Sequence, residues 1–349
     1  MKILYVLPSL KKQAPIKIAL TLAQGMHSSG HSVTILYFDD GIECDIPVGI
    51  VVEQVKFKSK YDLSKFDIVH SHMFRPDLYV FLNRIFKTSK TISTLHNYSY
   101  QELKSYYGTF YSLVFGSLWN LSWLNFDSLI TLTVDGKKYY KKYSLNKAVK
   151  HIYNGHDLSV DYESFDLEIT REIRYLKQRG YNIIGTYCNL TKRKRVDWLI
   201  KSLCDNSENA LVLIGDGSEK DTLKTLASES GVNERVVFID ARPDAHQFNY
   251  FFDVFCIPSL HEGFGLALIE AALHKKNIVC SDIPTFRELF SEKEVFFFES
   301  HCQKSLNEAI FEALNSNKGE AACLKARSLY SEEAMIQNYY LEYERLVDE

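Results

Sequence analysis

The sequence lacks any uninterrupted apolar run as long as a membrane-spanning helix requires. It also lacks a charged leader and a cleavage site, because a strand-like segment begins directly at Lys2. We therefore expect a cytoplasmic protein.

Cysteine offers no pairing pattern. The seven cysteines are scattered, their number is odd, and no two form a C-x-x-C pair. This excludes a zinc or thiol redox centre built on such pairs. Cys256 and Cys280 lie in apolar runs, which predicts small core side chains.

Neither basic nor acidic residues predominate strongly in any large part of the chain. The net formal charge is −3, from 41 basic and 44 acidic residues. Residues 1–170 hold 19 basic and 16 acidic side chains and the remainder holds 22 and 28, so the two parts carry +3 and −6. Without a strongly basic domain, a zinc-finger spacing or a single-strand binding motif, nucleic acid is not an expected partner.

Apolar strand-like runs alternate with helical patterns along the whole chain. Strands are expected at 3–7 and 33–38 with a helix at 15–29 between them, and a second series runs from 183 to 298. This alternation predicts parallel sheets wrapped by helices. A chain of 349 residues with 46% hydrophobic content is long enough for two cores. We place the connection between two α/β domains within the charged segment 157–178.

The most informative stretch is His261-Glu-Gly-Phe-Gly-Leu-Ala-Leu-Ile-Glu270, which places two carboxylates on either side of a glycine-rich turn. An apolar strand ends before it at Pro258, and Leu266, Ile269 and Leu273 give the segment after it an apolar helical face. The pattern predicts that Glu262 lies on a strand-to-helix turn.

Such a turn suits an anionic or hydroxylated ligand. The backbone amides at 264–266 would lack helical partners, and the positive end of the helix dipole would lie behind them. Gly263 and Gly265 let the main chain approach a ligand closely, and Glu270 could accept hydrogen bonds from a diol. A plainer alternative is that Glu262 only satisfies the helix start and Glu270 is an ordinary exposed helix residue.

This stretch resembles the E-x7-E motif of the retaining glycosyltransferases of family GT4. The resemblance implies the α/β GT-B fold, with two Rossmann-like, doubly wound parallel-sheet domains facing a central cleft. It places an acceptor-binding domain at 1–165, a nucleotide-sugar domain at 166–330, and a helix at 331–349 that crosses back to the first domain.

The resemblance also implies roles for individual residues. Glu262 would contact the donor sugar, Glu270 the ribose hydroxyls, and Lys194 the phosphates. The implied donor-binding set is Asn189, Arg193, Lys194, Glu262, Gly263, Phe264, Gly265, Leu266 and Glu270, and the implied catalytic set is His96, Glu262 and Lys194.

Two segments depart from the family pattern. Cys188 and Asn189 stand where Gly and Arg are usual, so half of the cationic clamp is missing, and Arg193 or Arg195 could compensate. The first loop, 8–15, lacks the paired glycines of the family and carries two lysines instead. The turn Gly215-Asp-Gly-Ser-Glu219 resembles a family turn but lacks the third glycine of a dinucleotide fingerprint.

Three histidines follow expected strands, at the edge where parallel sheets present their ligand-binding groups. His96 resembles the family histidine near the anomeric centre of the sugar and would approach from the acceptor side. His70 and His72 are candidates for structural roles.

The implied reaction is transfer to a hydroxyl with retention, by front-face attack in which the departing phosphate takes the acceptor proton. The sequence has no D-x-D motif near a phosphate-binding turn, so we expect no metal and no cofactor besides the nucleotide sugar. Expected partners are a nucleoside diphosphate sugar and a glycan or lipid-linked acceptor. One alternative is a sugar-nucleotide epimerase or hydrolase. Another is a non-catalytic binding partner, which the missing arginine and glycines suggest and the intact Glu262 and Glu270 oppose.

A membrane surface is a further expected partner. The segment 106–126 is rich in Tyr, Phe, Trp and Leu, and 136–142 contains four lysines. The first could dock on a bilayer or an acceptor lipid, and the second could favour an anionic membrane or acceptor. Core packing and a solvated helix face are the alternatives. We expect peripheral contact at the inner face of the membrane.

Overall fold

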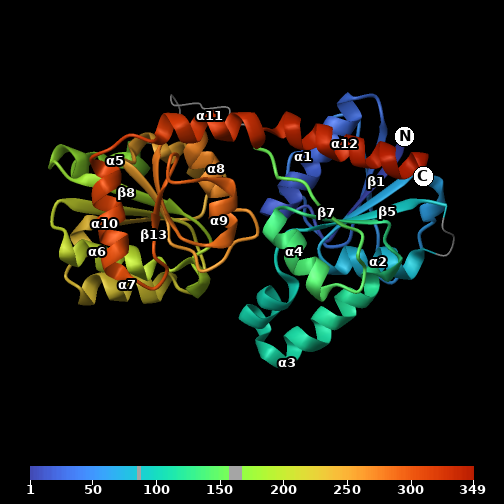
Figure 1. The fold of residues 1–349 in the computed structure, drawn as a ribbon, viewed down its shortest axis with the longest axis horizontal. Coiled ribbons are helices and arrows are strands. Elements are labelled where there is room, and N and C mark those ends of the chain that lie inside the picture. The colour runs from blue at the N-terminus through green and yellow to red at the C-terminus, as the bar shows by residue number, and fades with distance from the viewer. Residues whose placement is uncertain (85–87, 157–166) are drawn as a thin grey trace. The chain divides into compact units, whose positions relative to one another are not determined.

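The computed structural model describes residues 1–84, 88–156 and 167–349, which form two compact units (Figure 1). Unit 1 comprises Met1–Gly155 and Tyr330–Glu349, and unit 2 comprises His156–Leu329. The sequence placed these divisions after residues 165 and 330. The start of the predicted connection, 157–166, lies outside the described residues.

The second half of that predicted connection is a helix. Helix α5, Leu167–Gln178, belongs to unit 2, and its side chains Thr170, Ile173 and Leu176 are buried. Because most residues of this segment are charged or polar, the helical spacing of its few apolar residues was not recognised in the sequence. A polar helix needs only one apolar stripe to pack against a sheet.

Unit 1 is a seven-stranded parallel sheet with helices packed on it. Its strand order is β3-β2-β1-β4-β5-β6-β7. The strands are β1 Lys2–Leu7, β2 Ser32–Tyr37, β3 Val51–Gln54, β4 Ile68–His72, β5 Lys90–Leu95, β6 Ser128–Thr131 and β7 Val149–His151. The helices are α1 Ala14–Ser28, α2 Phe74–Asn83, α3 Ser99–Ser122, α4 Val134–Tyr143 and α12 Glu332–Asp348.

Unit 2 repeats the architecture with six parallel strands in the order β10-β9-β8-β11-β12-β13. The strands are β8 Asn182–Tyr187, β9 Asn209–Ile214, β10 Val236–Ile239, β11 Val254–Ile257, β12 Asn277–Ser281 and β13 Phe296–Phe298. After α5, the helices are α6 Asp197–Asp205, α7 Lys220–Glu229, α8 Leu266–Leu273, α9 Pro284–Leu289, α10 Gln303–Leu314 and α11 Gly319–Leu329. Both units are doubly wound, as the sequence predicted.

The apolar pattern accounts for these elements. Strand β1 is buried from Ile3 to Leu7, as expected for a parallel sheet covered on both faces. Helix α1 has Pro15 in its first turn and buries an apolar face, and Gly30 follows its end with a φ of 84°. The predicted helix at 15–29 is confirmed within one residue at each end.

A buried carboxylate ties α3 to the rest of unit 1. Asp77 on α2 accepts hydrogen bonds from the indole nitrogens of Trp119 at 2.6 Å and Trp123 at 2.7 Å, and from the hydroxyls of Ser71 and Ser93. Burial raises the pKa of Asp77 to about 6, although these four donors oppose the rise. The core-packing alternative is therefore correct for both tryptophans.

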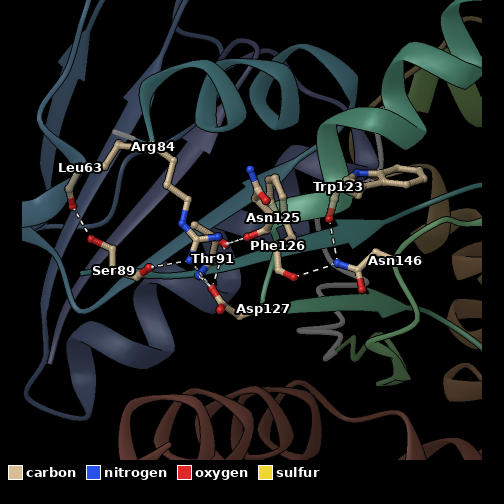
Figure 2. A network of polar contacts seen from close by, with 9 residues as sticks. All are labelled: Leu63, Arg84, Ser89, Thr91, Trp123, Asn125, Phe126, Asp127 and Asn146. Atoms are coloured by element: carbon tan, nitrogen blue, oxygen red, sulfur yellow. Dashed lines mark hydrogen bonds and ion pairs between the residues drawn. The ribbon is translucent and has the colours of Figure 1, made fainter. Parts of the chain in front are cut away.

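The turn after α3 is fixed by a second polar network, which Figure 2 shows. Asp127 pairs with Arg84 at 2.8 Å and accepts from the amide of Thr91 at 2.7 Å. Asn146 donates to the carbonyls of Trp123 and Phe126 at 2.7 and 2.8 Å. These bonds hold the chain where it leaves α3 and enters β6.

Within the described residues, no helix has both the length and the hydropathy to cross a bilayer.

The C-terminal helix α12 packs within unit 1. The hydroxyl of Tyr343 lies 2.6 Å from Nδ1 of His70 and 3.0 Å from the hydroxyl of Tyr5. Glu342 accepts from Ser128 at 2.8 Å and pairs with Lys150. The helix thus contributes buried polar partners to strands β1, β4, β6 and β7.

Candidate functional site

The strand order of unit 2 reverses between β8 and β11, which are neighbours in the sheet. Doubly wound sheets bind ligands outside the carboxyl ends of the strands at such a reversal. The loop after β8 carries Arg193, and the loop after β11 carries Glu262. The amide of Leu260 donates to the carbonyl of Arg193 at 2.9 Å, so the two loops are joined.

The strand-to-helix turn forms as the sequence predicted. Strand β11 ends at Ile257, and α8 begins at Leu266. Gly265 has a φ of 89°, and a Cβ there would lie 2.8 Å from the ring of Phe286. Both facts require glycine at this position. The Phe264 side chain is buried, which anchors the turn to the interior of unit 2.

Glu262 lies between two cations. Its Oε1 is 2.5 Å from Nζ of Lys194, and its Oε2 is 2.9 Å from Nη1 of Arg193. Arg193 also donates to the carbonyl of His261 at 2.7 Å, and the hydroxyl of Thr285 donates to the carbonyl of Glu262 at 2.8 Å. The structure therefore brings together three of the predicted site residues.

The charge state of Glu262 follows from this cluster. Burial alone would raise the pKa of Glu262, but the charges of Lys194 and Arg193 outweigh it and lower the pKa to about 2. The carboxylate is ionised at neutral pH. One anion held by two cations leaves the cluster with a net positive charge, which can attract a further anion.

The two arginines have different surroundings. Arg193 belongs to the Glu262 cluster. Arg195 instead stacks on the ring of Trp198, with its guanidinium carbon 4.1 Å from the ring centroid, and lies 3.8 Å from Asp197. Of the two arginines, Arg193 is the one that contacts Glu262.

Asn189 is exposed and lies beside a different group of residues. It lines a cavity of about 540 Å³ together with Tyr187, Asp216 and Arg242. The turn at Gly215 and Gly217 closes one side of this cavity. A Cβ on either glycine would lie 1.9 or 2.4 Å from the carbonyl oxygen of Cys188 or Leu190, so the Gly-Asp-Gly turn permits close backbone packing.

Glu270 lies on the second turn of α8 and is largely buried. Its Oε1 is 3.1 Å from Nε2 of His156. Tyr187 donates to the carbonyl of Ala267 at 3.2 Å, and burial together with the charge of Glu270 raises its pKa well above the usual value. Glu270 is therefore not the ordinary exposed residue of the plainer alternative.

Sequence reasoning missed the roles of His156 and Tyr187. Neither residue was a candidate from the sequence. Both contact the surroundings of Glu270 from positions far away in the chain. No periodicity reports a contact between distant segments, so only the fold could reveal them.

His96 belongs to unit 1 and follows β5. It lines a cavity of about 490 Å³ with Phe74, Arg75 and Trp119. Its Nε2 is 2.9 Å from Nδ1 of His72, and burial lowers the pKa of His96 to about 3. His96 is thus neutral at physiological pH.

His70 and His72 are fully buried. His70 bonds to Thr94 at 2.7 Å and to Tyr343, which is a structural role. Burial lowers the pKa of His70 to about 3 and holds that of His72 well below its usual value.

Comparisons with known proteins agree with this architecture. Residues 170–328 match the family model for glycosyl transferases group 1, and residues 17–160 match the model for Glycosyltransferase Family 4. The O-antigen biosynthesis glycosyltransferase WclY of Escherichia coli is 36% identical over 307 residues, which cover 84% of this chain and 83% of that protein.

Two solved structures share the fold. Sucrose-phosphate synthase from Thermosynechococcus elongatus aligns with a TM-score of 0.83 at 14% identity, covering 99% of both chains. Anabaena HepE, solved in complex with UDP and glucose, aligns with a TM-score of 0.82 at 17% identity, covering 99% of this chain and 100% of that one. The predicted GT-B fold class is confirmed.

Proposed function

Because the chain belongs to the group 1 glycosyltransferases of the family 4 type, we propose that it moves a sugar with retention from a nucleoside diphosphate sugar to a hydroxyl acceptor. The observation that carries the donor side of this proposal is the Glu262 cluster. It places two cations at the reversal of the unit 2 sheet, where the family motif was recognised.

In the proposed site, Lys194 and Arg193 stabilise the charge that grows on the diphosphate as the glycosidic bond breaks. Glu262 holds both cations in place and contacts the sugar, and the turn at 263–266 offers backbone amides. Glu270 accepts from the ribose hydroxyls, and His156 orients it at 3.1 Å. Asn189 contributes from the adjoining cavity.

No enzymatic nucleophile is assigned, so retention is assigned to front-face attack, in which the departing phosphate takes the acceptor proton. His96 then acts from the acceptor side as a neutral hydrogen-bonding group. We further propose that transfer needs no bound metal ion, because the two cations of the cluster supply the positive charge.

The acceptor is proposed to be a growing cell-surface polysaccharide or a lipid-linked glycan at the inner face of the membrane. Support comes from WclY, which is named for O-antigen biosynthesis. The structural neighbour HepE was solved with UDP-glucose, which supports a nucleotide sugar as the donor class.

The test is to incubate the protein with UDP-, GDP- and ADP-sugars, with and without lipid-linked and free glycan acceptors. We expect one donor to raise thermal stability and to release nucleotide only with an acceptor. NMR of the product should show the anomeric configuration of the donor. An inverted product would refute retention, and nucleotide release without acceptor would favour a hydrolase or epimerase.

One observation favours a second candidate, a non-catalytic binding partner. Asn189 stands where the family has arginine, which removes one cation from the site. Under this alternative a donor would bind, but no acceptor would lead to transfer. A variant with Asn189→Arg would then gain donor affinity without gaining activity.

A further inference from the structure

Helix α3 exposes an apolar surface that packing within unit 1 does not use. We define the α3 ridge as the exposed side chains Tyr107, Phe110, Tyr111, Leu113 and Val114 of α3, together with Leu124 in the short 3-10 turn that follows it. Phe110 is 72% exposed and Leu113 is 59% exposed, whereas Ser112, Trp119 and Trp123 on the same helical segment are buried. In Figure 1, α3 projects from unit 1 below α2 and α4. A surface helix normally turns a polar face to water, and this one is apolar on both faces.

The ridge differs from ordinary exposed apolar residues. No Asp, Glu, Lys or Arg occurs between Lys104 and Asp127. By contrast, Phe311 and Leu324 in unit 2 are similarly exposed but lie on separate helices. Single exposed apolar side chains are common, but a continuous group marks an interaction surface.

Lysines lie on α4, which contacts α3 near the C-terminal end of that helix. The end of α4 is bound to α3, since the side-chain amide of Asn120 donates to the carbonyl of Tyr143 at 2.7 Å. Lys138, Lys141 and Lys142 of α4 are exposed, and the ammonium of Lys142 lies 5.2 Å from the ring centroid of Tyr143. Aromatic and aliphatic side chains bordered by lysines suit the boundary between lipid headgroups and acyl chains.

We propose that the α3 ridge and the α4 lysines bind the surface of an anionic bilayer. A second copy of the chain could cover the ridge, but it would bring its own lysines to the same place. Anionic headgroups satisfy the apolar and the cationic parts together. This proposal rests on the proposed function, because it concerns where the acceptor of that reaction is held. The acceptor would be held in that bilayer, and Tyr107 of the ridge also lines the His96 cavity.

The experiment is co-sedimentation with vesicles of phosphatidylcholine alone or mixed with phosphatidylglycerol. The wild-type chain should bind the mixed vesicles more strongly. Phe110→Ser with Leu113→Ser should weaken binding at least about tenfold, because two large apolar side chains no longer enter the interface. Lys141→Gln with Lys142→Gln should weaken binding to the mixed vesicles by roughly fivefold or more.

The matched control is Phe311→Ser with Leu324→Ser, which should bind like the wild type. Equal binding by the ridge variant and this control would overturn the proposal, as would no binding to either vesicle. Loss of a dimer in the ridge variant during sedimentation without lipid would assign the surface to a second copy. Donor binding is measured on the same variants. A wild-type chain that binds vesicles but no donor would refute the proposed function alone.

A second observation concerns His72, which is fully buried at the end of β4. Its Nδ1 meets Nε2 of His96 at 2.9 Å, and its Nε2 has no hydrogen-bond partner among the described residues. Both rings are neutral, so each carries one N–H. If His96 donated, the proton of His72 would have to sit on Nε2, as a buried donor without a partner. That arrangement is costly.

We also infer that His72 donates from Nδ1 to His96 and so fixes the proton of His96 on Nδ1. His72 is then a positioning residue. Because Nε2 of His96 is occupied by His72, its Nδ1–H is the ring donor left for the cavity that His96 lines. This group then donates a hydrogen bond to a substrate oxygen instead of removing a proton. This agrees with a reaction in which the departing phosphate is the base.

The tautomer can be read directly from the nitrogen chemical shifts of protein labelled with 15N-histidine, with His96→Gln to assign the signals. We expect His96 to carry its proton on Nδ1 in the wild type. His72→Phe should release this preference, and His72→Asn, which keeps an N–H donor, should retain it. A wild-type His96 protonated on Nε2 would overturn the inference, as would an unchanged tautomer in the His72→Phe variant.

Discussion

The two units present chemically different groups at the corresponding edges of similar sheets. In unit 2, the loops at the β8–β11 reversal bring together an ionised carboxylate and two cations. In unit 1, His70 and His72 of β4 and His96 after β5 have pKa values that burial lowers, so these histidines are neutral. A shared architecture therefore carries one edge with fixed charges and one with neutral hydrogen-bonding groups, which we propose to serve the donor diphosphate and the acceptor hydroxyl. The chemistry is set by a few loop residues and not by the fold.

The largest expected effect is on the charged edge. Lys194→Met should lower the transfer rate by about a thousandfold, because the group that stabilises the leaving phosphate is lost. The matched control is Lys192→Met, an exposed lysine two residues earlier, which should stay within about twofold of the wild type. Rates of nucleotide release at saturating donor and acceptor measure both. Equal losses in the two variants would mean that the cluster has no special role.

The next effect is an acid stability difference between the units. A histidine whose folded pKa lies near 3 contributes stability above its unfolded pKa of 6.5, and this stability is lost as the pH falls toward 3. By pH 5 we expect a loss of about 2 kcal/mol for each of His70 and His96. Asp77, with a pKa of about 6, gains a proton in the folded state and offsets about 1 kcal/mol.

Unit 2 should resist the same change better. There, His274 has a pKa of about 4 and also loses about 2 kcal/mol by pH 5, which is less than the combined loss of His70 and His96. Glu262 loses its stabilising charge only below pH 4.5, as the pH approaches 2. Trp198→Phe leaves Trp119 and Trp123 as fluorescent reporters of unit 1 alone. Urea unfolding of this variant should show unit 1 weakening between pH 7 and 5. A unit 1 transition that does not move with pH would contradict the neutral-histidine assignment.

A smaller effect is expected at the turn before α8. Gly265→Ala should destabilise unit 2 by about 2 kcal/mol, because alanine is strained at a φ of 89° and its Cβ would crowd Phe286. Gly180 also has a positive φ, of 84°, but has open space around it. Gly180→Ala therefore measures the destabilisation caused by the positive φ alone. Thermal unfolding separates the two. If Gly265→Ala is no worse than the control, the packing against Phe286 does not matter.

The smallest expected effect is that of a chelator. Transfer should continue at the same rate in excess EDTA, since the cations of the Glu262 cluster are proposed to serve the diphosphate. The measurement is the initial rate before and after dialysis against EDTA. A loss that added Mg²⁺ or Mn²⁺ restores would show that a metal ion shares this task.

The sequence predicted the elements better than the contacts between them. The turn around Glu262 and the helix at 15–29 formed as expected, because each depends on a local pattern of apolar residues and glycines. The helix at Leu167–Gln178 was hidden by its charge. The sequence pointed to Lys194 as a phosphate-binding residue but did not show that its ammonium pairs with Glu262. That pairing joins two loops, and it depends on how strands β8 and β11 align in the sheet.

The central claim is that the positive cluster at Glu262 binds the diphosphate of the donor. Calorimetric titration with UDP, GDP and ADP tests it most directly, using the wild type, Lys194→Met and Lys192→Met. The account predicts that one nucleotide binds the wild type and Lys192→Met alike and binds Lys194→Met at least about tenfold more weakly. Binding of equal strength to all three proteins, or of no nucleotide to any, would contradict it.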